Sequence, residues 1–205
     1  MPEFCTYSTY QWSVTEKKAV HRRKVRKKYS KLTTVEKAPD YDVSGCTVCR
    51  EDQVDVAVEG LPTVRVCLYY APKLREALEL LAASKNFKVE KLVGYRVGQT
   101  RGRVVDGKRT GFSNHSYGTA IDINSASNGL YRRCDLKGVV PNTAEDIKQC
   151  KKGIGGIWNP AANPLTTITP ESPAYKLFTS VVGWKWGGEI EGRLKDFMHF
   201  SSDGR

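Results

Sequence analysis

Hydrophobic residues recur at helical spacing in one segment that follows residue 70. Leu74, Ala77, Leu78 and Leu81 stand at positions i, i+3, i+4 and i+7, which places them on one face of a helix. Pro72 lies just before them, and proline is favoured at the first helical position because its missing N–H would have no partner there. The pattern predicts a helix that begins near Pro72 and buries this face.

Other segments alternate or are rich in β-forming residues, which predicts strands. Tyr7 to Val14 alternates loosely, a polar turn follows, and residues 19–29 form the second half of a predicted hairpin. Further strands are predicted within 61–70 and 88–97, a short helix at 174–182, and loops at 31–55, 98–111 and 125–173. Because strands and helices do not alternate regularly, the expected fold class is α+β, with an antiparallel sheet and flanking helices.

Length and composition fit a globular chain with one main domain. The chain has 205 residues, of which 40% are hydrophobic and 27% charged. We predict an N-terminal extension at 1–60 and a main domain at 61–205. No apolar run approaches the ~18 residues that a membrane-spanning helix requires, and the first residues lack the charged start and apolar stretch of a signal peptide.

Positive charge is concentrated near the N-terminus. The net charge is +11, and the segment His21–Lys31 carries much of it. A solvated basic arm is the simplest interpretation, and binding to an anionic cell-wall polymer is the functional one. Nucleic acid is a weaker candidate, because no nucleic-acid-binding motif accompanies the run.

Six cysteines predict disulfides and therefore an oxidising compartment. The CxxC segment Cys46–Cys49 also fits a redox pair or half of a structural zinc site. Six cysteines allow fifteen pairings, and Cys134–Cys150 is the pairing that the sequence most favours.

Two of the three histidines stand near acidic residues. If residues 113–124 form a hairpin, His115 and Asp122 face each other across it, while Ile121 and Ile123 point to a core. An imidazole and a carboxylate on one face are two ligands of a zinc site, although a simple hydrogen-bonded pair fits equally well.

A second motif, near the C-terminus, offers a third metal ligand and a carboxylate for acid–base chemistry. His199 supplies a third ligand, and Asp196 is a nearby carboxylate that need not bind metal. Three protein ligands with one open position are typical of catalytic zinc, and a free carboxylate can serve as general base. A surface acid beside a structural histidine is the alternative.

Together these motifs resemble the zinc D-alanyl-D-alanine metallopeptidase family. The family pattern S-x-H-x-x-G-x-A-x-D matches residues 113–122, a Trp/Gly-rich segment matches 183–189, and an acid three residues before the last histidine matches 196–199. The family's Gly-Tyr-Arg matches 94–96. The order and approximate spacing hold across about residues 64–202, and several motifs in the right order are more specific than any one of them.

The resemblance implies one catalytic zinc ion bound by His115, Asp122 and His199. It implies Asp196 as the general base and Arg96 as the residue that binds a substrate carboxylate or the developing oxyanion. Further substrate contacts are assigned to Ser113, Trp184, Trp186 and Tyr95, although the tryptophans equally fit core packing and Tyr95 a structural role.

The implied activity is hydrolysis of D-Ala-containing peptidoglycan stem peptides, as a D-alanyl-D-alanine carboxypeptidase. The alternatives are an L-alanyl-D-glutamate endopeptidase and a non-catalytic binding module with the same zinc fold. The substrate and the cysteines favour a periplasmic or secreted protein, with a cytoplasmic location as the alternative.

Overall fold

The structure is a computed structural model that describes residues 2–136 and 138–204. The chain forms two compact units. Unit 1 comprises Met1–Asp55, Arg65–Ala71 and Gly94–Ala120, and unit 2 comprises Val56–Val64, Pro72–Val93 and Ile121–Arg205. The chain therefore passes from one unit to the other more than once. The predicted boundary between an N-terminal extension (1–60) and a main domain (61–205) stays a prediction, because units defined by contacts do not test it.

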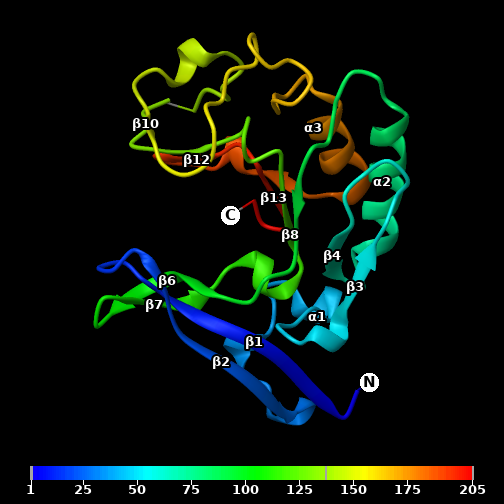
Figure 1. Cartoon of the computed structure of the whole chain (residues 1–205), viewed down its shortest axis with the longest axis vertical. Helices are drawn as coiled ribbons and strands as arrows, with labels where there is room; N and C mark the ends of the chain where they lie inside the picture. The colour runs from blue at the N-terminus through cyan, green and yellow to red at the C-terminus, as the bar shows by residue number, and fades with distance from the viewer. Residues whose placement is uncertain (1, 137, 205) are drawn as a thin grey trace. The chain divides into compact units, whose positions relative to one another are not determined.

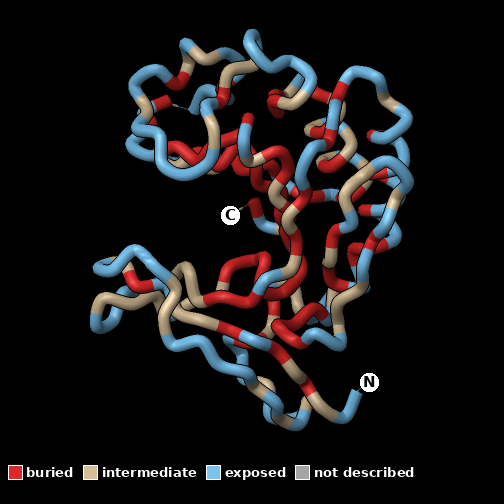
Figure 2. Tube along the Cα trace, viewed as in Figure 1, coloured by how far each residue is buried: buried red, intermediate tan, exposed pale blue. Residues whose placement is uncertain are grey.

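A four-stranded sheet in the order β2-β1-β6-β7 lies in unit 1 (Figure 1). Its strands are β1 (Phe4–Ser13), β2 (Lys18–Lys28), β6 (Gln99–Val105) and β7 (Lys108–Phe112). β1 and β2 pair antiparallel, which confirms the predicted N-terminal hairpin. β2 is an edge strand, and Figure 2 shows that most of it is exposed.

The segment from Gly98 to Gly111 was expected to be a loop, and this prediction is wrong. β6 and β7 form a hairpin in which Val105 lies opposite Lys108, so Asp106 and Gly107 make the turn. Both turn residues have positive φ, 48° and 72°, as a tight two-residue hairpin turn requires. The other glycines serve close packing, since a Cβ at Gly102 would lie 2.9 Å from the backbone nitrogen of Gly111.

The rest of unit 1 is mostly irregular, and the loop predicted for 31–55 is interrupted only by short helical turns and by a strand that begins at Gln53. Two disulfides link this part of the unit to strands. Cys5 on β1 bonds to Cys49, and Cys46 bonds to Cys67. The two cysteines of the CxxC segment therefore bond to distant partners and not to each other. The short elements are η1 (Tyr29–Lys31), η2 (Thr34–Glu36), α1 (Tyr41–Ser44), η3 (Arg50–Asp52) and η4 (Asn114–Tyr117).

The predicted helix is confirmed as α2 (Ala71–Ala83). Its four periodic apolar residues, Leu74, Ala77, Leu78 and Leu81, are at most 1% exposed. The predicted helix at 174–182 is confirmed as α3 (Pro173–Leu177), which continues as a π-helical turn, η6 (Phe178–Val182). Pro173 is the first residue of α3, and the Ser172 hydroxyl before it accepts a hydrogen bond from the Tyr175 N–H, as expected of an N-cap.

The remaining strands form three small sheets. One has the order β11-β13-β8-β5, one the order β10-β9-β12, and β3 pairs with β4. The predicted strand at 88–97 is reduced to the two residues of β5. These strands are β3 (Gln53–Val56), β4 (Val64–Cys67), β5 (Leu92–Val93), β8 (Ala120–Ile123), β9 (Leu130–Arg132), β10 (Lys151–Lys152), β11 (Lys185–Trp186), β12 (Leu194–Asp196) and β13 (His199–Ser201).

The long segment 125–173 is mostly irregular and packs against an aromatic core. Trp158 stacks on Phe197, with ring centroids 4.1 Å apart, and its indole N–H donates to the Ile168 carbonyl at 2.8 Å. The predicted Cys134–Cys150 disulfide is confirmed and closes part of this segment. The remaining short elements of unit 2 are η5 (Ala144–Ile147) and η7 (Gly187–Glu189).

The observed fold is mixed and rich in strands, which is compatible with the predicted α+β class. The strands form several small sheets instead of one. Among the described residues, no helix is both long enough and apolar enough to span a bilayer.

Candidate metal centre

His115 lies in η4, whereas the sequence predicted a strand. Ser113 is extended, and residues 114–117 then form a 3-10 turn that ends at Gly118. Gly118 has a φ of +68°, and a Cβ there would lie 2.4 Å from the backbone nitrogen of Cys67. The hairpin prediction failed on this side because the turn begins at Asn114, one residue before His115, rather than after it.

One nitrogen of His115 is held by the backbone. His115 is 2% exposed, and its Nδ1 lies 2.9 Å from the carbonyl oxygen of Gly94, which can only accept. Nδ1 therefore carries the proton and Nε2 keeps its lone pair. A ligating histidine commonly donates its other N–H to a carbonyl in this way, because the bond fixes the tautomer and the ring orientation.

Asp122 and His199 lie on two strands of one sheet. Asp122 is in the middle of β8, where Ile121 and Ile123 are fully buried, as the alternating pattern predicts. The N–H of Ile123 donates to the Met198 carbonyl at 2.8 Å, which aligns β8 with the start of β13. The Asp122 Oδ1 and the His199 Nδ1 are 3.0 Å apart.

Together, His115, Asp122 and His199 form a group that could hold a metal ion. Each offers one ligand atom, and the three atoms lie within 4.8 Å of one another. Two imidazoles and one carboxylate are the donors that zinc accepts, and three protein ligands leave one position open. The donor set and the backbone-held tautomer of His115 therefore fit a catalytic zinc ion.

Asp196 ends β12 and is not one of the three possible ligands of this group. It is 8% exposed, and β12 pairs with β9 so that Asp196 lies opposite Leu130. A Cβ at Gly187 would lie 2.2 Å from the Asp196 carbonyl oxygen and 3.1 Å from its Cβ. Only glycine therefore fits at position 187, and this close packing fixes the backbone that carries the carboxylate.

Ser113 is two residues before His115 in the sequence, and Arg96 is joined to His115 by a backbone hydrogen bond. The N–H of Arg96 donates to the His115 carbonyl at 3.0 Å. Ser113 is 4% exposed, and its hydroxyl has no hydrogen-bond partner among the described residues. A buried hydroxyl without a protein partner usually has a ligand or a water molecule as its partner, which is in line with the predicted substrate contact.

The aromatic candidates are buried in the protein. Trp184 and Trp186 are 2% and 0% exposed, and the Trp186 indole donates to the Phe197 carbonyl at 2.9 Å. For both residues, burial favours core packing over a position on a cleft wall. The Tyr95 hydroxyl donates to the Val48 carbonyl at 2.7 Å, a contact that fits a structural role, and burial raises the pKa of this hydroxyl. Their substrate-contact roles stay predictions.

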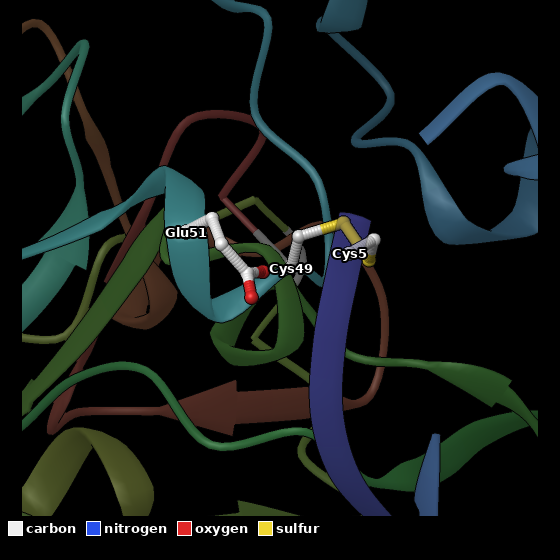
Figure 3. Close-up of side chains that lie close together, drawn as sticks. All are labelled: Cys5, Cys49 and Glu51. Atoms are coloured by element: carbon white, nitrogen blue, oxygen red, sulfur yellow. A yellow bond between two sulfur atoms is a disulfide. The ribbon is translucent and has the colours of Figure 1, made fainter. Parts of the chain in front are cut away.

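A second group of possible ligands is closed by a disulfide. Cys5, Cys49 and Glu51 lie close together in unit 1, and Figure 3 shows the two sulfurs bonded to each other. A disulfide sulfur is not a thiolate and does not bind zinc. The Glu51 carboxylate accepts from the Thr6 backbone at 2.8 Å, so this group is structural.

Sequence reasoning missed one cluster of side chains. Arg50 and Arg65 line an open cavity in unit 1 together with residues of β1 and β2. The basic run of β2 was recognised in the sequence. Arg50 and Arg65 are single residues in unremarkable segments, so only the folded chain brings them to the same cavity.

Comparisons with known proteins give one match. Residues 106–202 match the family model described as D-alanyl-D-alanine carboxypeptidase. No curated protein and no solved structure matches the chain. The matched region contains the three possible ligands and Asp196, whereas Tyr95 and Arg96 lie before it. The match covers slightly less than half of the chain, and over residues 106–202 it supports the predicted resemblance to the D-alanyl-D-alanine metallopeptidase family.

Proposed function

We propose that this protein is a zinc-dependent D-alanyl-D-alanine carboxypeptidase that removes the terminal D-alanine from peptidoglycan stem peptides. The observation that carries the proposal is the group formed by His115, Asp122 and His199 inside the matched region. The family match supports a peptidase of this kind, and the donor set supports zinc.

The metal would be held by His115, Asp122 and His199. When bound, zinc supplies a Lewis acid that polarises the scissile carbonyl and lowers the pKa of a coordinated water to about 7. The Gly94 carbonyl keeps the proton of His115 on Nδ1, which leaves Nε2 as the donor atom. The partly buried Asp122 and the buried His199 present a carboxylate oxygen and an imidazole nitrogen 3.0 Å apart.

Asp196 would move the protons of the reaction. Its carboxylate accepts a proton from the attacking water and later donates it to the amine of the leaving D-alanine. Arg96 binds the substrate carboxylate or the developing oxyanion through its planar set of donors. Ser113 adds a hydrogen bond to the substrate, for which its unpaired hydroxyl is available.

The substrate implies where the protein works. Stem peptides lie outside the cytoplasmic membrane, and three disulfides are stable in an oxidising compartment. We therefore propose a periplasmic or secreted protein.

The test is mass spectrometry of peptidoglycan fragments incubated with protein of verified zinc content. We expect loss of a terminal alanine from pentapeptide stems. Asp196→Ala is expected to keep the metal and lose activity, while Glu191→Ala, which removes an exposed acid five residues away, keeps it. A cut between L-Ala and D-Glu would instead establish the endopeptidase. No cleavage by the zinc-bound protein would favour a non-catalytic binding module.

A further inference from the structure

An open cavity of about 640 Å³ lies within unit 1, and its charged lining is entirely positive. It is bordered by β1, β2 and the segment 95–97. We name it the arginine groove. Among the residues that the structure describes, its cationic residues are Arg22, Arg23, Lys24, Arg50, Arg65 and Arg96, and none of its lining residues is acidic.

The fold gathers these cations from separate parts of the chain. In the β1–β2 hairpin, Arg23 lies opposite Thr9 and Lys24 opposite Ser8. Arg50 follows Cys49, which the disulfide to Cys5 fixes to β1 (Figure 3).

A backbone hydrogen bond links two further segments of the groove. The N–H of Tyr95 donates to the Arg65 carbonyl at 2.7 Å, which joins β4 to the segment that carries Arg96. Covalent and backbone bonds therefore place cations from four segments around one cavity.

Most of these charges are not neutralised within the protein. Arg65 forms an ion pair with Asp55 at 2.6 Å. Arg22, Arg23, Lys24 and Arg50 are exposed and make no ion pair with any residue that the structure describes. Like charges held close together repel one another, and an anion bound among them relieves this repulsion.

Protection of a sheet edge explains only part of this charge. β2 is an edge strand, and lysines and arginines on such a strand prevent pairing with other chains. This accounts for Arg26 and Lys28 on β2, which lie outside the groove. It does not account for Arg50 and Arg65, which belong to other elements and line the same cavity.

The tyrosines of the groove indicate which polyanion fits. The Tyr7 hydroxyl donates to Glu36, and the Tyr7 ring packs edge-on against Phe112. The Arg22 guanidinium lies over the ring of Tyr10, 5.9 Å from its centroid. The third tyrosine, Tyr95, donates its hydroxyl to a backbone carbonyl. Proteins that bind single-stranded nucleic acid stack bases on available aromatic rings, and each tyrosine here already has a partner.

We propose that the arginine groove binds a linear phosphodiester polymer without bases, a polyol phosphate, through Arg22, Arg23, Lys24 and Arg50. Arginine binds phosphate oxygens with two donors at once, and the cavity is open enough to admit a chain. The groove thus gives the basic segment His21–Lys31 a defined binding site. This inference concerns binding alone and does not depend on peptidase activity.

The experiment measures binding of fluorescently labelled poly(glycerol phosphate) to the full-length protein by anisotropy, between about 50 and 200 mM salt. We expect binding that weakens with salt with a log–log slope near −3, since about 0.7 counterions are released per phosphate neutralised on a single chain. An oligothymidylate with the same number of phosphates is the comparison ligand, and it should bind more weakly.

Two double variants distinguish binding in the arginine groove from non-specific attraction to the positive charge of β2. Arg22→Ala/Arg23→Ala is expected to weaken binding by at least about tenfold, because two charge-assisted hydrogen bonds are lost. Arg26→Ala/Lys28→Ala removes the same charge from the same strand outside the groove, and should weaken binding less than about threefold.

Three results would overturn the proposal. They are absence of polymer binding, equal losses in the two double variants, and binding of the oligothymidylate that equals or exceeds that of the polymer. The last result would assign the groove to single-stranded nucleic acid. Because all four substituted residues are exposed, near-ultraviolet circular dichroism should show both variants folded.

Discussion

The two units of this protein are stabilised in different ways. Unit 1 has 17 Lys and Arg against 9 Asp and Glu, a net charge of +8, whereas unit 2 has 16 against 13, a net charge of +3. Two of the three disulfides lie in unit 1. Among the described residues, the twelve largest fully buried side chains, which include three tryptophans and three phenylalanines, all lie in unit 2.

This difference shows how a small basic unit can be stable with little apolar core. In unit 1, covalent links and buried polar pairs take over part of the role that apolar burial has in unit 2. Glu36, for example, is 4% exposed and bonds Tyr7, Lys27 and Thr33. Unit 2 instead relies on packed aromatic rings such as Trp158 and Phe197. Substitutions in the two units should therefore have different consequences.

The largest effect is expected in the aromatic core of unit 2. Trp158→Ala removes a fully buried ring and its hydrogen bond, which should lower the free energy of unfolding by about 3–5 kcal/mol. Ile157→Ala is the control, because Ile157 is adjacent and 66% exposed. Urea unfolding measures both variants. A loss for Trp158→Ala no larger than that of the control would contradict the assignment of stability to this core.

The second effect concerns the disulfides of unit 1. Cys5→Ala/Cys49→Ala opens a link across 44 residues and should cost about 2–4 kcal/mol. Hydrogen exchange should show loss of protection in β1, with α2 much less affected. Cys134→Ala/Cys150→Ala, which opens a link across 16 residues in unit 2, is expected to cost less. A larger loss of unfolding free energy on removal of the unit 2 disulfide than of the unit 1 disulfide would contradict this comparison.

The third effect tests close packing at a glycine. Gly118→Ala places a Cβ 2.4 Å from the Cys67 nitrogen at a φ of +68°. Gly45→Ala has nearly the same φ of +66°, and its Cβ has no atom of a described residue within 4 Å. Both variants carry similar backbone strain, so the difference between their unfolding free energies reports the steric clash of the new Cβ at position 118. We expect Gly118→Ala to be the more destabilising by about 1–3 kcal/mol in thermal or urea unfolding. Equal losses would show that the neighbours move aside.

The smallest effect depends on pH. Burial raises the pKa of Glu36, but hydrogen bonds from Lys27, Tyr7 and Thr33 outweigh it and lower the pKa from 4.5 to about 2. Because the folded pKa lies below the unfolded one, this stabilisation is complete above pH 4.5 and is lost as the pH falls towards 2.

Glu36→Gln should therefore lower the melting temperature at neutral pH, and the difference from wild type should shrink between pH 4.5 and pH 2. Glu59→Gln, which changes an exposed acid, serves as the control and should show no such convergence. A difference that stays constant with pH would assign the effect to packing instead of charge.

The sequence predicts the elements whose signal is local. The periodic leucines give α2, and the alternation of residues 7–14 gives β1. The alternation around Asp122 correctly sends Ile121 and Ile123 to the core. These patterns succeed because the geometry of a helix or a strand places residues of a fixed spacing on one face, so the signal lies within a short stretch of sequence.

Features that depend on distant residues were not predictable from the sequence. The glycines between 98 and 111 suggested a loop, although Gly102 is required by close approach to the opposite strand. Only one of the three disulfide pairings was favoured by its spacing. The possible metal ligands were found because a family pattern preserves their order, whereas Arg50 and Arg65 had no comparable signal.

The disulfide pattern of the CxxC segment has a consequence for how the chain is oxidised. In the reduced chain, Cys46 and Cys49 are each other's nearest thiols, and the bond between them closes the smallest loop. The native bonds join these residues instead to Cys67 and Cys5. A locally formed bond must then be broken by attack of another thiolate. Recovery of the protein from inclusion bodies should therefore depend on a glutathione buffer or an isomerase that permits exchange, and strong oxidants alone should trap mispaired chains.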